Sequence, residues 1–106
     1  MVQIKWTIRA LNDLREIYEF IARDSHSYAQ IQIEKIQGNV LKLSKFPLIG
    51  RHVPEFPRLS YREIIVGNYR AIYRVDENQN RIFIMSIVHG RRLLKNALKT
   101  NMIDEQ

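Results

Sequence analysis

Hydrophobic and polar residues alternate with two different periods in the first half of the chain. Val2, Ile4 and Trp6 are separated by single polar residues, which predicts a short strand over residues 2–6. Apolar residues then recur at helical spacing in two segments, separated by the polar residues 24–27. The first segment holds Ala10, Leu14, Ile17 and Ile21, and the second holds Ala29, Ile33, Ile36, Val40 and Leu43. These patterns predict a strand followed by a helical hairpin.

Local signals set the expected limits and faces of the two helices. Asp13 lies on the polar side of the first helical pattern, so we expect it to face solvent. Ser27, with Gln30 three residues later, fits a capping box at the start of the second helix. A glycine inside a helix costs about 1 kcal/mol relative to alanine, so Gly38 is expected to be tightly packed. The helix should end at Phe46, because a following proline restricts that residue to extended geometry.

The second half of the chain has the pattern of a loop followed by a strand meander. All three prolines fall in residues 47–57, which predicts an ordered loop. The turn Gly67-Asn68 places glycine first in a two-residue hairpin loop, which suits a type II′ turn. Runs of β-branched and aromatic residues predict strands at residues 61–66, 69–75 and 81–89, with a polar loop at 76–80 and closing helical turns at 93–99.

The element order βααβββ predicts an α+β domain. The N-terminal strand and the helical hairpin should pack on one face of a mostly antiparallel sheet, with a short helix at the C-terminal end. The other face of the sheet is expected to stay open. A chain of 106 residues with 45% hydrophobic content can form one modest core, so we expect a single domain over residues 1–106.

Positive charge is concentrated in the second half of the chain. The net charge is +6, and residues 51–100 hold 10 basic side chains against 4 acidic ones. Most of these basic residues are arginines, whose planar guanidinium suits phosphates and carboxylates. The charge therefore favours a polyanionic partner, either RNA or an acidic protein segment. A solvated surface that only keeps the protein soluble explains the charge equally well.

Composition excludes several other classes of protein. The chain has no cysteine and no apolar run of about eighteen residues, so we expect neither disulfides nor a membrane span. Its first six residues do not resemble a signal peptide, which predicts a cytoplasmic protein. Three scattered histidines without cysteine show no metal-ligand spacing, so no metal or other cofactor is expected.

Arginines on the middle hairpin strand are the first candidates for chemistry. Alternation along a strand places Arg70 and Arg74 on one face, and Arg62 of the neighbouring strand joins them if the register allows. Such a cluster can bind a phosphate or a carboxylate. The simpler alternative, which the arginines alone favour, is surface ion pairing with Glu63 or Glu55.

His89, at the end of the last predicted strand, is the candidate proton carrier. An imidazole titrates near neutrality, and neighbouring arginines can stabilise a phosphorane-like transition state. With Glu55, these side chains supply the acid, base and cations that metal-independent RNA cleavage needs. A lone histidine at a strand end is otherwise more often a hydrogen-bonded surface residue.

Four segments together resemble the RelE/ParE toxin superfamily along nearly the whole chain. They are Trp6-Thr7 with Ala10 and Asp13-Leu14, then Phe46-Pro47-x-x-Gly50-Arg51 with Pro54-Glu55, then Arg62-Glu63 with Tyr69-Arg70-x-x-Tyr73-Arg74-Val75, and Val88-His89-Gly90-Arg91-Arg92. Their order agrees with the βααβββ pattern. The resemblance implies a toxin that is encoded beside an antitoxin and is wrapped by an acidic, partly disordered antitoxin segment. Any contact with DNA would be indirect, through the toxin–antitoxin complex.

The resemblance leaves the cellular target open. RelE-like and YoeB-like members cleave mRNA on the ribosome without metal, whereas ParE-like members inhibit DNA gyrase. Glu55, Arg70 and His89 match the catalytic glutamate, arginine and histidine of YoeB-like nucleases, which narrowly favours ribosome-dependent mRNA cleavage. Gly90 stands where those nucleases have tyrosine, and Arg51 and Arg58 occupy the loop where RelE-like nucleases have lysines. Gyrase inhibition is therefore the alternative, and a non-toxic binding module on the same fold is a third.

The sequence and the resemblance together indicate a set of candidate catalytic residues and a set of candidate binding residues. The candidate catalytic residues are Glu55, Arg62, Arg70, Arg74 and His89. We expect the acidic antitoxin segment to bind the arginine-bearing sheet face and the C-terminal basic stretch. The candidate partner-binding or RNA-binding residues are Arg51, Arg58, Arg81, Arg91, Arg92 and Lys95.

Overall fold

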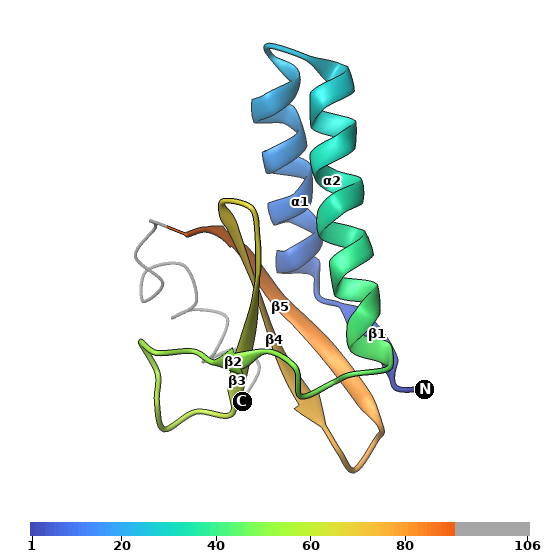
Figure 1. The fold of residues 1–106 in the computed structure, drawn as a ribbon, viewed down its shortest axis with the longest axis vertical. Helices are drawn as coiled ribbons and strands as arrows, with labels where there is room; N and C mark the ends of the chain where they lie inside the picture. Colours follow the sequence, from blue (N-terminus) through green and yellow to red (C-terminus); the bar gives the residue numbers. More distant parts are fainter. Residues whose placement is uncertain (91–106) are drawn as a thin grey trace.

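A helical hairpin and a five-stranded sheet make up residues 1–90, the part of the chain that the computed structural model describes (Figure 1). The predicted order βααβββ is confirmed, with one additional short strand before the meander. The C-terminal helix predicted at residues 93–99 lies outside the described residues. The elements are β1 (Gln3–Trp6), α1 (Ile8–Ala22), α2 (His26–Leu41), the 3-10 helix η1 (Lys42–Ser44), β2 (Arg51–His52), β3 (Tyr61–Val66), β4 (Tyr69–Asp76) and β5 (Arg81–His89).

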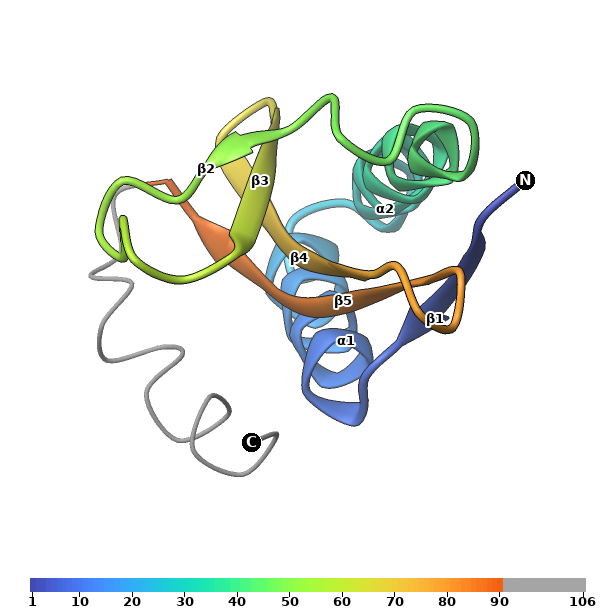
Figure 2. The same ribbon diagram turned by 90° about the horizontal axis from the view of Figure 1, so that it is seen from below.

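The sheet is mixed, with strand order β1-β5-β4-β3-β2. Strands β2 to β5 pair antiparallel with their neighbours, and β1 pairs parallel with β5. The helical hairpin follows β1 and covers one face of the sheet (Figure 2). At the β3–β4 turn, Gly67 has a φ of +60°, which agrees with the predicted type II′ turn. In residues 1–90, no helix has the length and apolar character needed to cross a membrane.

Both helices begin at a hydroxyl side chain that caps the backbone. Thr7 Oγ1 accepts a hydrogen bond from Ala10 N at 3.2 Å and also donates to Ile84 O at 2.7 Å. Ser25 Oγ accepts from Tyr28 N at 3.1 Å and so begins α2. The predicted cap at Ser27 is therefore wrong, because the reversal between the helices is short enough for α2 to begin two residues earlier.

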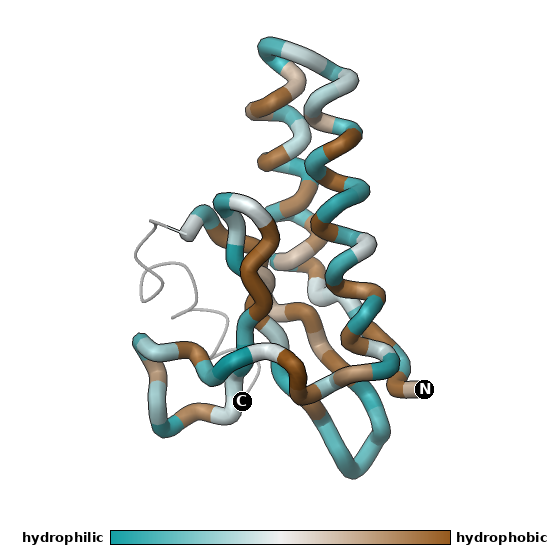
Figure 3. Tube along the Cα trace, in the orientation of Figure 1, coloured by the Kyte–Doolittle hydropathy of each residue, from teal (hydrophilic) through white to brown (hydrophobic). Residues whose placement is uncertain are grey.

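The main core lies between the helices and the sheet. Its helical side is the predicted seam, in which Ala10, Leu14, Ile36, Val40 and Leu43 are buried. Its sheet side consists of Val66, Ala71, Tyr73, Ile82, Ile84 and Ile87. Figure 3 shows hydrophobic and hydrophilic residues alternating along both helices. Gly38 is outside this core: in residues 1–90, no atom beyond the backbone of its own helix lies within 4 Å of the place where its Cβ would be, so the prediction of tight packing there is wrong.

A second, smaller core covers the face that was expected to stay open. Val53, Tyr61, Ile72, Met85 and Val88 are buried on this side, with Phe56, Leu59 and Phe83 packed against them. Val53, Phe56 and Leu59 come from the segment between β2 and β3, which folds back over the sheet (Figure 2). The prediction of an open face is therefore wrong, because the proline-containing loop supplies apolar side chains of its own.

Tyr73 holds the start of this loop against the sheet. Its hydroxyl donates to Pro47 O at 2.8 Å and accepts from Gly50 N at 2.9 Å. A Cβ at position 50 would lie 2.6 Å from the Tyr73 hydroxyl and 2.7 Å from Glu63 O. Only glycine fits there, which gives the Phe46-Pro47-x-x-Gly50 pattern its physical reason.

Candidate functional site

A buried ion-pair cluster forms around Arg70 on the face of the sheet opposite the helices. Arg70 Nη2 donates to Glu55 Oε2 at 2.7 Å, and Arg70 Nη1 donates to Glu55 Oε1 and Glu63 Oε1, both at 3.1 Å. Arg51 Nε donates to the other Glu63 oxygen at 2.6 Å. Arg70 is 6% exposed and Glu63 is 1% exposed. Arg70 therefore forms both of the expected ion pairs, but the pair with Glu63 is buried and only Glu55 remains partly exposed.

Strand pairing explains why these side chains meet. Ile65 pairs with Arg70 and Glu63 pairs with Ile72, so Glu63 and Arg70 are diagonal neighbours on one face. Glu55 reaches the same face from the loop that covers it. Sequence reasoning did not include Glu63 among the candidate site residues. Glu63 shares the two-residue period of Tyr61 and Ile65 along β3, and this position is the sequence signal that would have placed it there.

Hydrogen bonding changes the acidity of this cluster. The hydrogen bonds from Arg70 lower the pKa of Glu55 below its ordinary value, although burial acts in the opposite direction. The hydrogen bonds to Glu55 also raise the pKa of Arg70. Both groups are therefore charged near neutral pH. Arg70 Nε is buried and has no hydrogen-bond partner within the described residues.

The other two arginines of the candidate catalytic set have different surroundings. Arg74 lies on the same face as Arg70, and its guanidinium stacks on the Phe83 ring at 4.4 Å from the centroid. Arg62 pairs with Tyr73, which faces the helices, so the register places it on the opposite face from Arg70. Its Nη1 donates to Gly50 O at 2.7 Å and to Leu48 O at 3.3 Å. The expectation that Arg62 would join Arg70 and Arg74 is therefore wrong.

His89 also lies on the other face of the sheet. It pairs directly with Tyr69, which packs against the core under the helices, and the two rings meet edge to face with centroids 5.6 Å apart. Its neighbour Val88, which pairs with Arg70, belongs to the core on the opposite face. A cavity of about 290 Å³ at the β3–β4 turn is nevertheless lined by Arg51, Arg70 and His89. The candidate cation Arg70 and the candidate proton carrier His89 thus approach one cavity from two sides of the sheet, and Glu55 does not belong to its lining.

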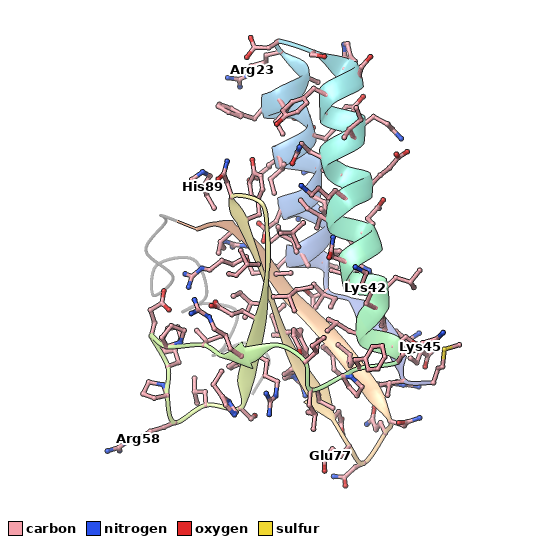
Figure 4. All side chains as sticks on the ribbon, in the orientation of Figure 1. Arg23, Lys42, Lys45, Arg58, Glu77 and His89 are labelled. Atoms are coloured by element: carbon pink, nitrogen blue, oxygen red, sulfur yellow. The ribbon has the colours of Figure 1, made fainter. Side chains whose placement is uncertain are left out.

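The three described arginines of the candidate partner-binding set do not form a single patch. Arg51 is tied to Glu63, and Arg58 projects from the loop far from His89 (Figure 4). Arg81 begins β5 and His89 ends it, which places them ~26 Å apart at about 3.3 Å per residue. Arg91, Arg92 and Lys95 lie outside the described residues. In residues 1–90, no group of three or more His, Asp or Glu side chains could hold a metal ion.

Asp13 is a buried polar residue that the helical pattern placed on the wrong side. Its Oδ2 accepts from Ser86 Oγ at 2.6 Å and from Ile87 N at 3.0 Å, and its Oδ1 accepts from Arg9 Nε at 3.2 Å. A register shift in the β4–β5 pairing precedes Ser86, and it disturbs the regular ladder there. Asp13 therefore fastens α1 to β5, and its expected exposure is wrong.

The comparison with known protein families identifies the chain. A family model described as the ParE toxin of the type II toxin–antitoxin system parDE matches residues 4–94. The chain belongs to the ParE toxin family. It is therefore a toxin of the RelE/ParE superfamily, as the four sequence segments predicted. The match includes every candidate catalytic residue of this ParE-family toxin.

Solved structures share the fold of this ParE-family toxin. The chromosomal ParDE system from P. aeruginosa is 24% identical, with a TM-score of 0.68 over 84% of this chain and 96% of that chain. A mutant of the E. coli toxin RelE in the free state is 15% identical, with a TM-score of 0.69 over 99% and 98%. The intact E. coli RelBE toxin–antitoxin complex is 18% identical, with a TM-score of 0.58 over 87% and 100%. No curated protein matches the sequence.

Proposed function

We propose that this ParE-family toxin arrests growth by binding DNA gyrase, without cleaving RNA, and is held inactive by a cognate antitoxin. One observation supports gyrase binding over mRNA cleavage. The cation that would stabilise a phosphate, Arg70, and the candidate proton carrier, His89, belong to opposite faces of the sheet. A cleavage mechanism needs both groups within hydrogen-bond reach of one scissile phosphate.

The state of Glu55 supports the same proposal. Both of its carboxylate oxygens accept hydrogen bonds from Arg70, and this interaction lowers its pKa. A general base works best when its pKa is near the operating pH, so a carboxylate of lowered pKa accepts a proton poorly at neutrality. Glu55 is better suited to holding Arg70 in place. The match to the ParE family agrees with a target other than mRNA.

Two assays of the purified toxin test this proposal. We expect the toxin to inhibit supercoiling by DNA gyrase and to leave a coupled translation reaction unaffected at the same concentration. A heat-denatured sample of the same preparation controls for contaminants. Inhibition of translation together with unimpaired gyrase would contradict the proposal.

The cavity at the β3–β4 turn favours a second function, ribosome-dependent mRNA cleavage. Arg51, Arg70 and His89 all line this space of about 290 Å³, so an RNA strand bound there would meet the two arginines and the histidine from different sides of the sheet. The ribosome and its bound mRNA would then be the partners. In that case the translation assay would show cleaved mRNA, and His89→Ala would abolish most of the cleavage, since a general acid or base contributes about 10²–10⁴-fold.

Complexes of relatives with antitoxins support the antitoxin partner. The RelBE structure contains toxin and antitoxin, and the P. aeruginosa structure is of a ParDE system. For this chain, the sequence predicts that an acidic segment of the antitoxin binds the arginine-bearing face of the sheet. Residues 53–59 already cover much of that face, and Arg70 is buried beneath them. An antitoxin segment therefore needs another apolar surface with basic neighbours.

A further inference from the structure

Exposed apolar side chains gather where α2 ends and the chain turns toward the sheet. Leu41 is 69% exposed and Phe46 is 59% exposed. With Met1 and Gly38 they line a groove of about 390 Å³, within the size range of ligand sites. Figure 3 shows hydrophobic stretches at this end of the molecule. An apolar surface of this kind commonly marks a site of interaction.

Gly38 keeps the groove open. Glycine destabilises a helix interior relative to alanine, yet no contact within residues 1–90 requires it at position 38. The backbone there is regular α-helix, and apart from that helix's own backbone no atom of the described residues lies within 4 Å of the place of a Cβ. Gly38, Leu41, Lys42 and Lys45 are spaced three or four residues apart, so they lie on one side of the helical segment. A larger side chain at position 38 would fill the groove without disturbing the core.

The charge around the groove selects the chemistry of its occupant. Lys42 and Lys45 belong to its lining, and among the described residues no acidic side chain does (Figure 4). A second copy of this chain would bring the same lysines against each other. An apolar side chain flanked by carboxylates would gain both burial and charge complementarity.

We propose that this groove binds an acidic, amphipathic segment of the antitoxin, with an apolar side chain seated over Gly38. The inference rests on the proposed function only in requiring an antitoxin, and not in the choice of gyrase or ribosome as target. It places the antitoxin contact at the end of α2 instead of on the arginine-bearing sheet face.

The test compares two leucine substitutions on the same helix. Gly38→Leu fills the groove, whereas Gln37→Leu adds the same side chain at an exposed position that does not line it. The toxin variants are titrated by calorimetry with the product of the reading frame adjacent to the toxin's own. We expect Gly38→Leu to weaken binding at least 10-fold and Gln37→Leu to bind as the wild type does. Gly38→Leu should also raise the melting temperature, because leucine is the better helix former.

A charge-reversal variant provides an independent check. Lys42→Glu with Lys45→Glu should weaken antitoxin binding and reduce its dependence on salt. Unchanged affinity in both Gly38→Leu and the double variant would overturn the proposal. Wild-type dimers that become monomers on Gly38→Leu would also overturn it, since a second copy would then be the occupant. Growth arrest by the free Gly38→Leu toxin should match the wild type, which separates a failure of the groove from a failure of the toxin function.

Discussion

At the scale of single residues, Arg70 and Glu63 form the buried centre of the ion-pair cluster. Both are almost completely buried, and each relies on the other to compensate the loss of hydration. Arg70 also binds Glu55 at the edge of the cluster, and Glu63 also binds Arg51. This arrangement fixes the loop over the sheet.

Removing Glu63 should therefore be strongly destabilising. We expect Glu63→Ala to lower the free energy of unfolding by about 3–5 kcal/mol, because a buried guanidinium loses part of its compensation. Glu77→Ala, in the loop between β4 and β5, is the control and should change stability by less than about 0.5 kcal/mol. Urea unfolding followed by circular dichroism measures both, and a small loss in Glu63→Ala would mean that the cluster does not stabilise the fold.

Glu55 gives the protein a predictable response to acid. The pKa of Glu55 is lowered below its ordinary value of 4.5, so its stabilising effect is complete above that pH and is lost as the pH falls toward the folded-state pKa. Wild type should be more stable than Glu55→Gln at pH 7, and the difference should shrink below about pH 4.5. Unfolding free energies of both proteins between pH 7 and pH 3 check this, and a difference independent of pH would contradict it.

At the scale of the elements, α1 depends on a buried carboxylate for its attachment to the sheet. Asp13→Ala leaves Ile87 N without its acceptor and removes a bond from Ser86. We expect a loss of about 2–3 kcal/mol, the usual range for hydrogen bonds to a charged group. Ser86→Ala, which keeps the Ile87 bond, should cost less. Equal stability of Asp13→Ala and wild type in thermal unfolding would show that apolar packing alone positions α1.

The packing of α2 can be tested with two isoleucines. Ile36 is 1% exposed within the main core, whereas Ile31 lies on the outside of the same helix. Ile36→Ala should cost about 2–5 kcal/mol, because it opens a cavity. Ile31→Ala should cost less than about 0.5 kcal/mol. Similar melting temperatures for the two variants would mean that the helix face is wrongly assigned.

Periodicity predicted the long elements well. The apolar seams of both helices and the strands at residues 61–66 and 81–89 are confirmed. Periodicity works for these elements because each of their sides faces a single environment, either the core or the surface, along its length. The two-residue strand β2 is too short to show an alternation of apolar and polar residues. The loop over the second sheet face could not be foreseen either, since its Val53, Phe56 and Leu59 become a core only through long-range contacts.

At the scale of the whole molecule, the site depends on the register of strands that are distant in sequence. Alternation correctly placed Arg70 and Arg74 on one face. It could not decide the face of Arg62 or His89, because that depends on how β3 and β5 align with β4. Asp13 was misplaced for a similar reason: its partners Ser86 and Ile87 are more than seventy residues away.

This ParE-family toxin is proposed to stop growth without cutting RNA. Mapping of mRNA ends on ribosomes, during growth arrest by the wild-type toxin, tests it most directly, with His89→Ala expressed in parallel. Our account predicts arrest with no new mRNA ends, a DNA-damage response, and little effect of His89→Ala, since a binding surface spreads its energy over several residues. New mRNA ends at ribosome-bound codons that disappear in His89→Ala would contradict it.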